Sequence, residues 1–211
     1  LPFAVTATVT VTATSNGCPG PPKIFSVTAT PNPSGNLTLT GSANICAGQN
    51  AVFSVNITGG TAPFTIIYAI NGVDQAPITT NNNPYTLNVP LSTTSVVSLV
   101  SVAANGCTGN GNGSANVNVT PTPTATIGPG GATICTGEST TIDVDLTGTG
   151  PFTFIYRING INQVPVNTPG PTYSINVTPN NPGTFNYTLV SVTGNGCTGT
   201  FSGTGTLNVI T

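Results

Sequence analysis

The residues best suited to chemistry in this chain are its five cysteines, because the sequence contains no histidine. They are Cys18, Cys46, Cys107, Cys135 and Cys197. A thiol can act as a nucleophile, bind a metal or form a disulfide. Zinc is disfavoured because there is no Cys-x-x-Cys spacing and no histidine ligand. Disulfide formation is therefore the chemistry that these residues favour.

The spacing of the cysteines is periodic and predicts how they pair. Cys107 follows Cys46 by 61 residues, Cys197 follows Cys135 by 62, and Cys46 and Cys135 are 89 apart. We therefore expect one disulfide in each repeat, Cys46–Cys107 and Cys135–Cys197. Cys18 occupies a second-cysteine position and is expected to pair upstream of the segment, with a free reactive thiol as the alternative. Paired cysteines indicate an oxidising, extracytoplasmic location.

The elements that position these cysteines recur along the chain. Residues 189–199 match residues 99–109 almost unchanged, and residues 10–20 are a looser copy. Each copy is an alternating strand leading into an Asn-Gly turn, with the cysteine on the far side. Asn-Gly readily supplies two residues with positive φ, which is typical of a tight β-hairpin. Three copies at one period indicate a tandem array.

The repeats predict the domain organisation and the fold class. Residues 1–31 are expected to be the C-terminal part of a preceding immunoglobulin-like (Ig-like) repeat in an excerpt of a longer protein, and residues 32–121 and 122–211 one repeat each. About seven short strands per repeat, with turn signals and no helical period, predict an Ig-like β-sandwich. Proline-rich joints at 28–33 and 120–124 favour extended spacers. The expected fold is all-β, with tandem Ig-like β-sandwich repeats of about 89 residues arranged end to end.

The expected core follows from the apolar strands. The chain has no tryptophan, and its cysteines flank turns rather than lie in mid-strand. The disulfide is therefore expected to clamp one end of each sandwich. The centre of the core is left to Phe64, Ile66, Tyr68, Leu87, Leu99 and their equivalents.

The composition argues against several kinds of partner. Only 3% of the residues are charged and the net charge is −2, so nothing favours binding to nucleic acid or to an anionic membrane. The sequence contains no run of 18 apolar residues, so no membrane-spanning helix is predicted. Because 37% of the residues are hydrophobic, we expect a folded chain whose surface is wetted by hydroxyl and amide groups.

The other candidate sites are weak, and no enzyme, cofactor or metal is predicted. Asp143 and Asp145 resemble part of a calcium loop, but strand alternation places both on a solvent face. The glycine-rich residues 109–113 are expected to form a flexible hairpin tip, not a phosphate-binding loop. A rank of threonines in residues 6–14 resembles an ice-binding face but fits an ordinary exposed strand. Six Asn-x-Ser/Thr sequons, at Asn36, Asn56, Asn112, Asn118, Asn176 and Asn186, leave glycosylation open.

The motifs resemble a known class of surface protein. Ile45-Cys46-Ala47-Gly48, Pro63-Phe64-Thr65-x-x-Tyr68, residues 85–89 and residues 99–109 are similar to the Ig-like/PKD-like repeats of large Bacteroidota cell-surface adhesins, including the gliding-motility adhesins of the SprB type. The resemblance implies export by type 9 secretion, anchoring at the outer membrane and attachment to surfaces or polysaccharides. It supplies no catalytic residues.

Three functions are compatible with these observations. The first is a non-catalytic stalk or filament segment of a secreted adhesin, whose partners are the neighbouring repeats of its own chain and, through the adhesin, surfaces or surface polysaccharide. The second is a glycan-binding module that uses aromatic residues, although Tyr68, Tyr85, Tyr156, Tyr173 and Phe185 follow core patterns. The third is a subunit of a self-assembling extracellular filament.

Overall fold

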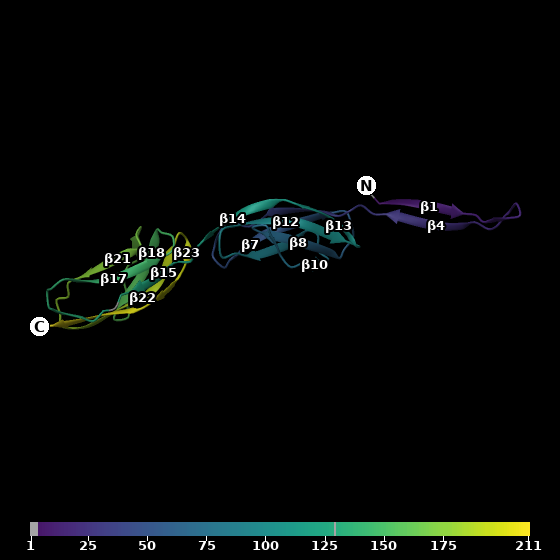
Figure 1. The fold of residues 1–211 in the computed structure, drawn as a ribbon. Helices are drawn as coiled ribbons and strands as arrows, with labels where there is room; N and C mark the ends of the chain where they lie inside the picture. Colours follow the sequence, from purple (N-terminus) through teal and green to yellow (C-terminus); the bar gives the residue numbers. More distant parts are fainter. Residues whose placement is uncertain (1–3, 129) are drawn as a thin grey trace. The chain divides into compact units, whose positions relative to one another are not determined.

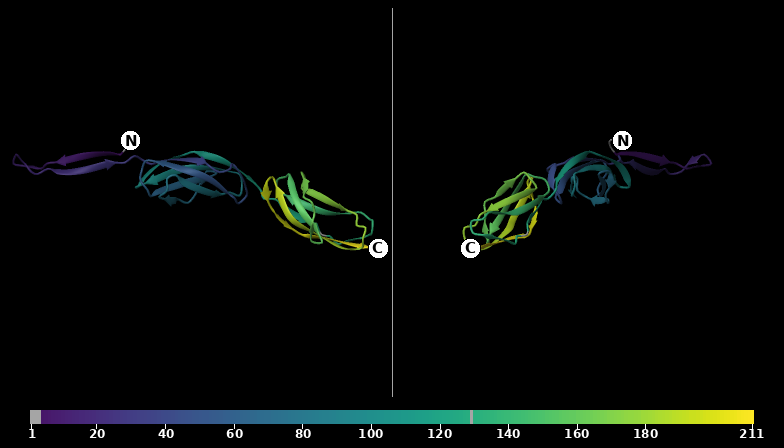
Figure 2. Two further views of the ribbon diagram at one scale, coloured as in Figure 1. Left: turned by 180° about the vertical axis from the view of Figure 1, so that it is seen from behind. Right: turned by 60° about the vertical axis from the view of Figure 1, so that its left-hand side comes forward.

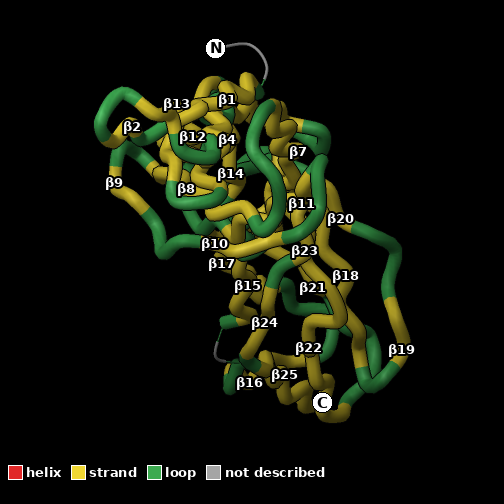
Figure 3. Tube along the Cα trace, turned by 90° about the vertical axis from the view of Figure 1, so that its right-hand side faces the viewer, coloured by secondary structure: helices red, strands yellow, loops and turns green. Residues whose placement is uncertain are grey.

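A computed structural model describes residues 4–128 and 130–211, and every regular element in them is a β-strand (Figures 1 and 3). The fold is all-β, as the sequence predicts. The chain forms two compact units. The first holds the described residues up to 43 together with 50–90 and 95–117, and the second holds 44–49, 91–94 and the described residues from 118 onward. The domain boundaries expected at 31/32 and 121/122 stay predictions.

The first unit begins with a two-stranded hairpin. Strands β1 (Val5–Val11) and β4 (Lys23–Ala29) pair antiparallel along their whole length, and the two purple strands run side by side in Figure 2. Between them, β2 (Thr14–Ser15) pairs with β3 (Cys18–Pro19) around the first Asn-Gly turn. All residues of the four strands are exposed. The return strand predicted after Cys18 is therefore present.

The rest of the first unit is a β-sandwich whose two layers are linked through one strand. In the first layer β7 pairs with β5 and β11, and in the second β8 pairs with β9, β10 and β12, and β12 with β14. The linking strand, β13, is antiparallel to β12 and parallel to β5. The strands are β5 (Ser34–Leu39), β7 (Asn50–Thr58), β8 (Phe64–Ile70), β9 (Val73–Asp74), β10 (Ile78–Thr80), β11 (Tyr85–Pro90), β12 (Ser95–Ala104), β13 (Cys107–Asn112) and β14 (Ser114–Thr120), the last of which continues into the second unit.

The second unit has the same two-layer plan, but its two layers are separate sheets. One sheet has the order β21-β17-β15-β24 and the other β16-β25-β22-β18-β19, with β20 on β18 and β23 on β22. The short β6 pairs parallel with the end of β14. The strands are β6 (Asn44–Cys46), β15 (Thr124–Ile127), β16 (Ala132–Cys135), β17 (Thr140–Thr147), β18 (Phe152–Ile158), β19 (Ile161–Asn162), β20 (Val166–Thr168), β21 (Thr172–Val177), β22 (Gly183–Gly194), β23 (Cys197–Thr198), β24 (Thr200–Ser202) and β25 (Thr204–Ile210).

Alternating side chains from the two layers build each core. In the first unit Phe53 and Val55 from one layer and Ile66 from the other are fully buried. In the second, Val144 and Phe154 are buried from opposite sheets. Of the predicted core residues, Phe64, Ile66, Leu87 and Leu99 are buried. Burying such apolar faces is the main force that holds these sandwiches together.

The core prediction fails for Tyr68, which is only partly buried. A β-bulge in β12 explains the difference. The pairing shifts so that Leu99 opposes Tyr68 and Ser101 opposes Ile67, which leaves Val100 as an extra, exposed residue. Burial therefore skips from Leu99 to Val102 instead of alternating. The equivalent bulge lies in β22, where Ser191 opposes Ile155 of β18 and Leu189 opposes Tyr156, and Tyr156 is likewise partly exposed.

The Asn-Gly turns form as predicted. Asn16, Asn71, Asn105, Asn159 and Asn195 all have φ between 46° and 51°, and each is followed by a glycine that also has positive φ. Two successive positive φ angles define the type I′ turn that fits the twist of a β-hairpin. These local signals fix where the strands reverse.

The structure offers no candidate for a membrane-spanning helix, since none of the described residues is helical.

Candidate functional site

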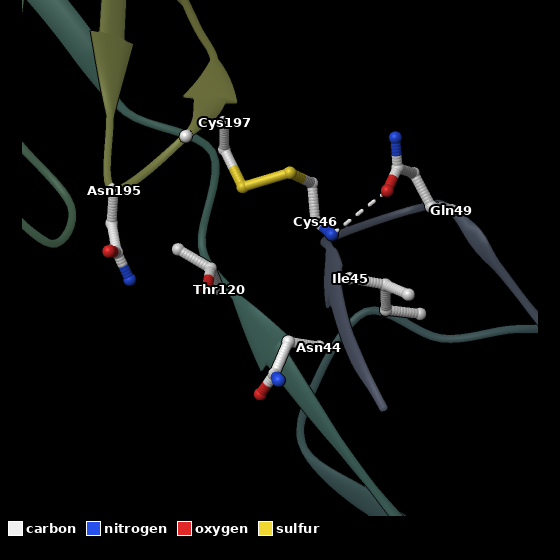
Figure 4. A pocket seen from close by; sticks show the side chains of 8 residues that line it. Asn44, Ile45, Cys46, Gln49, Thr120, Asn195 and Cys197 are labelled. Carbon is white, nitrogen blue, oxygen red and sulfur yellow. Dashed lines mark hydrogen bonds between the residues drawn. A yellow bond between two sulfur atoms is a disulfide. The ribbon is translucent and has the colours of Figure 1, made fainter. Parts of the chain in front are cut away.

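The strongest candidate site is a disulfide between Cys46 of β6 and Cys197 of β23 (Figure 4), whose Cα atoms are 5.7 Å apart. Both cysteines lie in the second compact unit. In sequence terms the bond joins the 32–121 repeat to the 122–211 repeat. The predicted pairs Cys46–Cys107 and Cys135–Cys197 are therefore wrong, and Cys18, Cys107 and Cys135 are free thiols.

The direction of the strands explains why Cys46 does not pair with Cys107. β7 is antiparallel to β5, β5 is parallel to β13, and β13 is antiparallel to β12, so β7 and β12 run the same way. Cys46 precedes β7, whereas Cys107 follows β12. The two cysteines therefore lie at opposite ends of β12, whose ten residues span about 30 Å.

The register of the strands confirms this placement. Val117 pairs with Ser95 at the start of β12. Thr120, three residues further along β14, pairs with Cys46, whereas Cys107 pairs with Ala104 at the end of β12. Because a disulfide needs Cα atoms within about 7 Å, the turns inside one repeat cannot be bridged.

Cys46 is held by a tight turn, which we call the Ile-Cys turn (residues 45–48). The backbone N–H of Cys46 donates to Gln49 Oε1 at 3.0 Å, and the N–H of Gln49 donates to the Cys46 carbonyl at 3.0 Å. The N–H of Ala47 donates to the Thr120 carbonyl at 2.9 Å. These bonds fix the cysteine without any charged group.

Cys197 is held by the second motif, which we call the Asn-Gly-Cys hairpin (residues 195–197). The cysteine pairs with Gly194 across the hairpin, and its side chain is 3% exposed. The N–H of Asn195 donates to the Pro151 carbonyl at 3.1 Å. The Asn-Gly-Cys stretch that recurs in the sequence is therefore a hairpin that holds Cys197 in place for the disulfide.

A shallow polar pocket of about 330 Å³ surrounds the disulfide (Figure 4). Its lining is made of amide, hydroxyl, aliphatic and disulfide groups: Asn44, Ile45, Cys46, Gln49, Thr120, Asn195, Gly196 and Cys197. None of these eight residues carries a titratable group, since both cysteines are oxidised. The pocket can offer hydrogen bonds, but it contains no acid, base or nucleophile.

The carboxylates of β17 lie as predicted. Asp143 and Asp145 are exposed and alternate with the buried Ile142, Val144 and Leu146. Asp143 Oδ1 accepts a hydrogen bond from Ser174 Oγ at 2.7 Å. Among the described residues, no group of three or more histidine, cysteine, aspartate or glutamate side chains is placed to hold a metal ion.

The glycine-rich segment 109–113 differs from the prediction. Instead of a flexible tip, its residues up to Asn112 belong to β13, where Gly111 pairs with Gly35 of β5. A β-carbon on Gly109 would collide with the Pro33 carbonyl. Glycine is needed here because two backbones approach closely.

Other sequence features lie on the surface. In β1, Thr6, Thr8 and Thr10 share one exposed face, and Thr6 Oγ1 lies 3.0 Å from Thr28 Oγ1 of β4. The strand ends at Val11, so the predicted rank of threonines is shorter than residues 6–14. The asparagines of all six sequons are exposed.

The tyrosines of the second unit are packed against its core. Tyr156 and Tyr187 stack with ring centroids 6.4 Å apart, and Tyr173 meets Phe154 edge-on at 5.6 Å. Burial, and to a smaller extent the neighbouring Tyr156, raises the pKa of the Tyr187 phenol. Burial and then Tyr173 raise the pKa of Tyr156. Neither ring is free to act as an exposed platform for a ligand.

Comparison with known proteins supports the fold alone. No model of a protein family matches the chain. No curated protein matches it either. Among solved structures, an I-band fragment of titin is similar with 16% identity and a TM-score of 0.54, covering 86% of this chain and 66% of its own. A three-Ig titin structure with an E-to-A mutation is similar with 15% identity and a TM-score of 0.52, covering 84% of this chain.

The chain spans 66% and 63% of the length of the two titin structures, and at these identities they show an Ig-like fold in tandem domains. A disulfide is typical of extracellular or secreted proteins.

Proposed function

We propose that this chain is a non-catalytic stalk or filament segment of a large secreted cell-surface adhesin. The observation that carries the proposal is the Cys46–Cys197 bond, which joins one sequence repeat to the next. A covalent link between successive repeats suits a part that bears load between an anchor and a binding end. The Ig-like fold, and a disulfide pocket that offers only neutral hydrogen-bonding groups, support the same role.

The biological setting comes from the resemblance of the repeat motifs to Bacteroidota adhesins. In this proposal the protein is exported by type 9 secretion, anchored at the outer membrane, and serves surface attachment or gliding motility. Its partners are the neighbouring repeats of the same chain, and the adhesin as a whole contacts surfaces or surface polysaccharide. Within the adhesin, this chain supplies length and stiffness.

Small-angle scattering of the purified, oxidised chain tests the stalk role. A compact 211-residue protein would have a radius of gyration of about 17 Å. An end-to-end arrangement of repeats predicts a value well above this, together with an elongated pair-distance distribution. A radius near the compact value would overturn the proposed stalk.

Two further measurements separate the stalk from the alternatives. Antibodies against the chain should label intact cells of the source organism, and labelling only after permeabilisation would contradict a surface location. A glycan array should give no specific binding, because Tyr156 and Tyr187 pack against the core. Specific hits would favour the glycan-binding module, and concentration-dependent polymers of the oxidised chain that persist after Cys135→Ser would favour a self-assembling filament.

A further inference from the structure

Three free cysteines in this chain are the repeat equivalents of the two that are bonded. Cys135 lies one period of 89 residues after Cys46, and Cys107 lies 90 residues before Cys197. Cys18 lies 89 residues before Cys107. Each free thiol therefore occupies one half of a bond that the structure shows complete elsewhere.

The Ile-Cys turn around Cys135 (residues 134–137) is built like the one around Cys46. The N–H of Cys135 donates to Glu138 Oε2 at 2.9 Å, and the N–H of Glu138 donates to the Cys135 carbonyl at 3.1 Å. The N–H of Thr136 donates to the Ile210 carbonyl at 2.9 Å. Each of these bonds has its counterpart at Cys46, so the turn presents its thiol in the same local frame.

The hairpins around Cys107 and Cys18 match the one around Cys197. Each cysteine follows an Asn-Gly pair with positive φ and pairs across the turn, Cys107 with Ala104 and Cys18 with Ser15. Cys197 pairs with Gly194 in the same way. The three hairpins are therefore interchangeable in how they hold the thiol.

Burial differs between the bonded and the free halves. Cys197 is 3% exposed, whereas Cys107 is partly exposed and Cys18 is exposed. Ile45 beside Cys46 is buried, whereas Ile134 beside the exposed Cys135 is only partly buried. The Ile-Cys turn and the Asn-Gly-Cys hairpin are thus more buried where the disulfide is formed than where the cysteine is free.

We propose that every Ile-Cys turn of this repeat type forms a disulfide with the Asn-Gly-Cys hairpin of the following repeat, so that an array of repeats is linked by a continuous series of inter-repeat bonds. Cys135 is the acceptor for the hairpin of one further repeat, and Cys107 and Cys18 bond to Ile-Cys turns of preceding ones. The partner is a domain of this same repeat type, either in one chain or in a second copy. This covalent linkage does not depend on the adhesive role.

The oxidation needs an external disulfide such as oxidised glutathione. The thiolate of Cys135 attacks one sulfur of the oxidant, forming a mixed disulfide and releasing one glutathione thiolate. The partner hairpin thiolate then attacks the sulfur of Cys135 and displaces the second glutathione. The two protein thiols thereby lose two electrons and two protons. These electrons and protons are taken up by the two glutathione molecules, which leave in the reduced form.

The direct test adds one repeat to the complete chain. A second copy of residues 122–211 is fused after Thr211, and the protein is refolded in a glutathione redox buffer. Non-reducing peptic digestion and mass spectrometry then map the bonds. The expected product retains Cys46–Cys197 and also joins Cys135 to the appended cysteine that corresponds to Cys197. A closed pair within the appended repeat, or Cys135 left as a thiol, would overturn the proposal.

The molecular mass of the oxidised product shows whether the partner repeat belongs to the same chain or to a second copy. A monomer with the new bond places successive repeats of one chain together. Disulfide-linked oligomers that join Cys135 to Cys18 or Cys107 of another copy place the partner in a second chain. Bonds between two Cys135 residues, or between two hairpin cysteines, contradict the complementary pairing. Cys135→Ser in the extended chain is the matched control and should abolish the new bond while leaving Cys46–Cys197 intact.

Discussion

Asn71 Oδ1 accepts a hydrogen bond from the backbone N–H of Val96 at 2.8 Å, while the N–H of Asn71 donates to the Val96 carbonyl at the same distance. Asn71 also has a φ of 50° in the turn after β8. One residue therefore both reverses the chain and fastens the turn to β12. Asn159 does the same with Asn186 in the next repeat.

Replacing this asparagine should separate its two roles. Asn71→Ala loses the two side-chain hydrogen bonds, from the Val96 N–H to Oδ1 and from Nδ2 to Ser95 Oγ, together worth about 1–2 kcal/mol. Alanine also lacks the polar side chain that lets asparagine adopt the left-handed region, which costs roughly 1–2 kcal/mol more. Asn71→Gly loses the same two hydrogen bonds, but glycine adopts a positive φ without the backbone cost. Urea unfolding should therefore show a free energy of unfolding lower by about 2–4 kcal/mol for alanine and by about half of that for glycine. Equal losses would mean that the backbone conformation carries no cost.

The close approach between Gly109 and Pro33 makes a second prediction. A β-carbon at Gly109 would collide with the Pro33 carbonyl, as it would at Gly199 against Pro123. Gly109→Ala should lower the free energy of unfolding by at least about 2 kcal/mol, because backbone must move. Gly170→Ala is the matched control, since its β-carbon would meet nothing closer than 3.9 Å, and should change stability by less than about 0.5 kcal/mol. Similar melting temperatures for the two variants would contradict the packing.

The cysteine pairing is tested by single substitutions in the purified chain. Cys46→Ser, Cys197→Ser and the double variant should all lower stability by the same amount, roughly 2–5 kcal/mol, because each breaks one bond. Cys107→Ser and Cys135→Ser should melt like the unmodified chain. If Cys107→Ser instead destabilises as much as Cys46→Ser, the bond lies within the repeat.

The buried phenols give a pH dependence. The pKa values of Tyr156 and Tyr187 are raised in the folded chain, above the usual value of about 10. Their contribution to stability is complete below about pH 10 and is lost as the pH rises from there through the raised values. Tyr187→Phe should weaken this alkaline loss of stability. The free energy of unfolding in urea is measured between about pH 9.5 and 11, around the usual tyrosine pKa of about 10. If it falls with pH as steeply in Tyr187→Phe as in the unmodified chain, the Tyr187 phenol does not contribute.

Local sequence signals predicted most of the secondary structure of this protein. The Asn-Gly pairs predicted the hairpins because positive φ is a property of the residues themselves. Alternation placed Asp143 and Asp145 outside and Val144 inside because successive side chains on a strand face opposite ways. Gly109 and Gly111 led to the wrong prediction of a flexible hairpin tip, because glycine suits flexible loops and is also the residue that close backbone packing requires.

Long-range pairing decided what the cysteines do. The repeat period revealed that Cys46 and Cys135 occupy equivalent turns and that Cys107 and Cys197 occupy equivalent hairpins, but it could not show the direction of β12 relative to β7. That direction is set by the parallel contact of β13 with β5, between residues far apart in the sequence. Likewise, the bulge at Val100 that leaves Tyr68 half-exposed arises from pairing with β8. The sequence alone determined the strands, turns and repeats, because these depend on neighbouring residues; only the tertiary structure decided which thiols meet, because that depends on how whole strands are ordered.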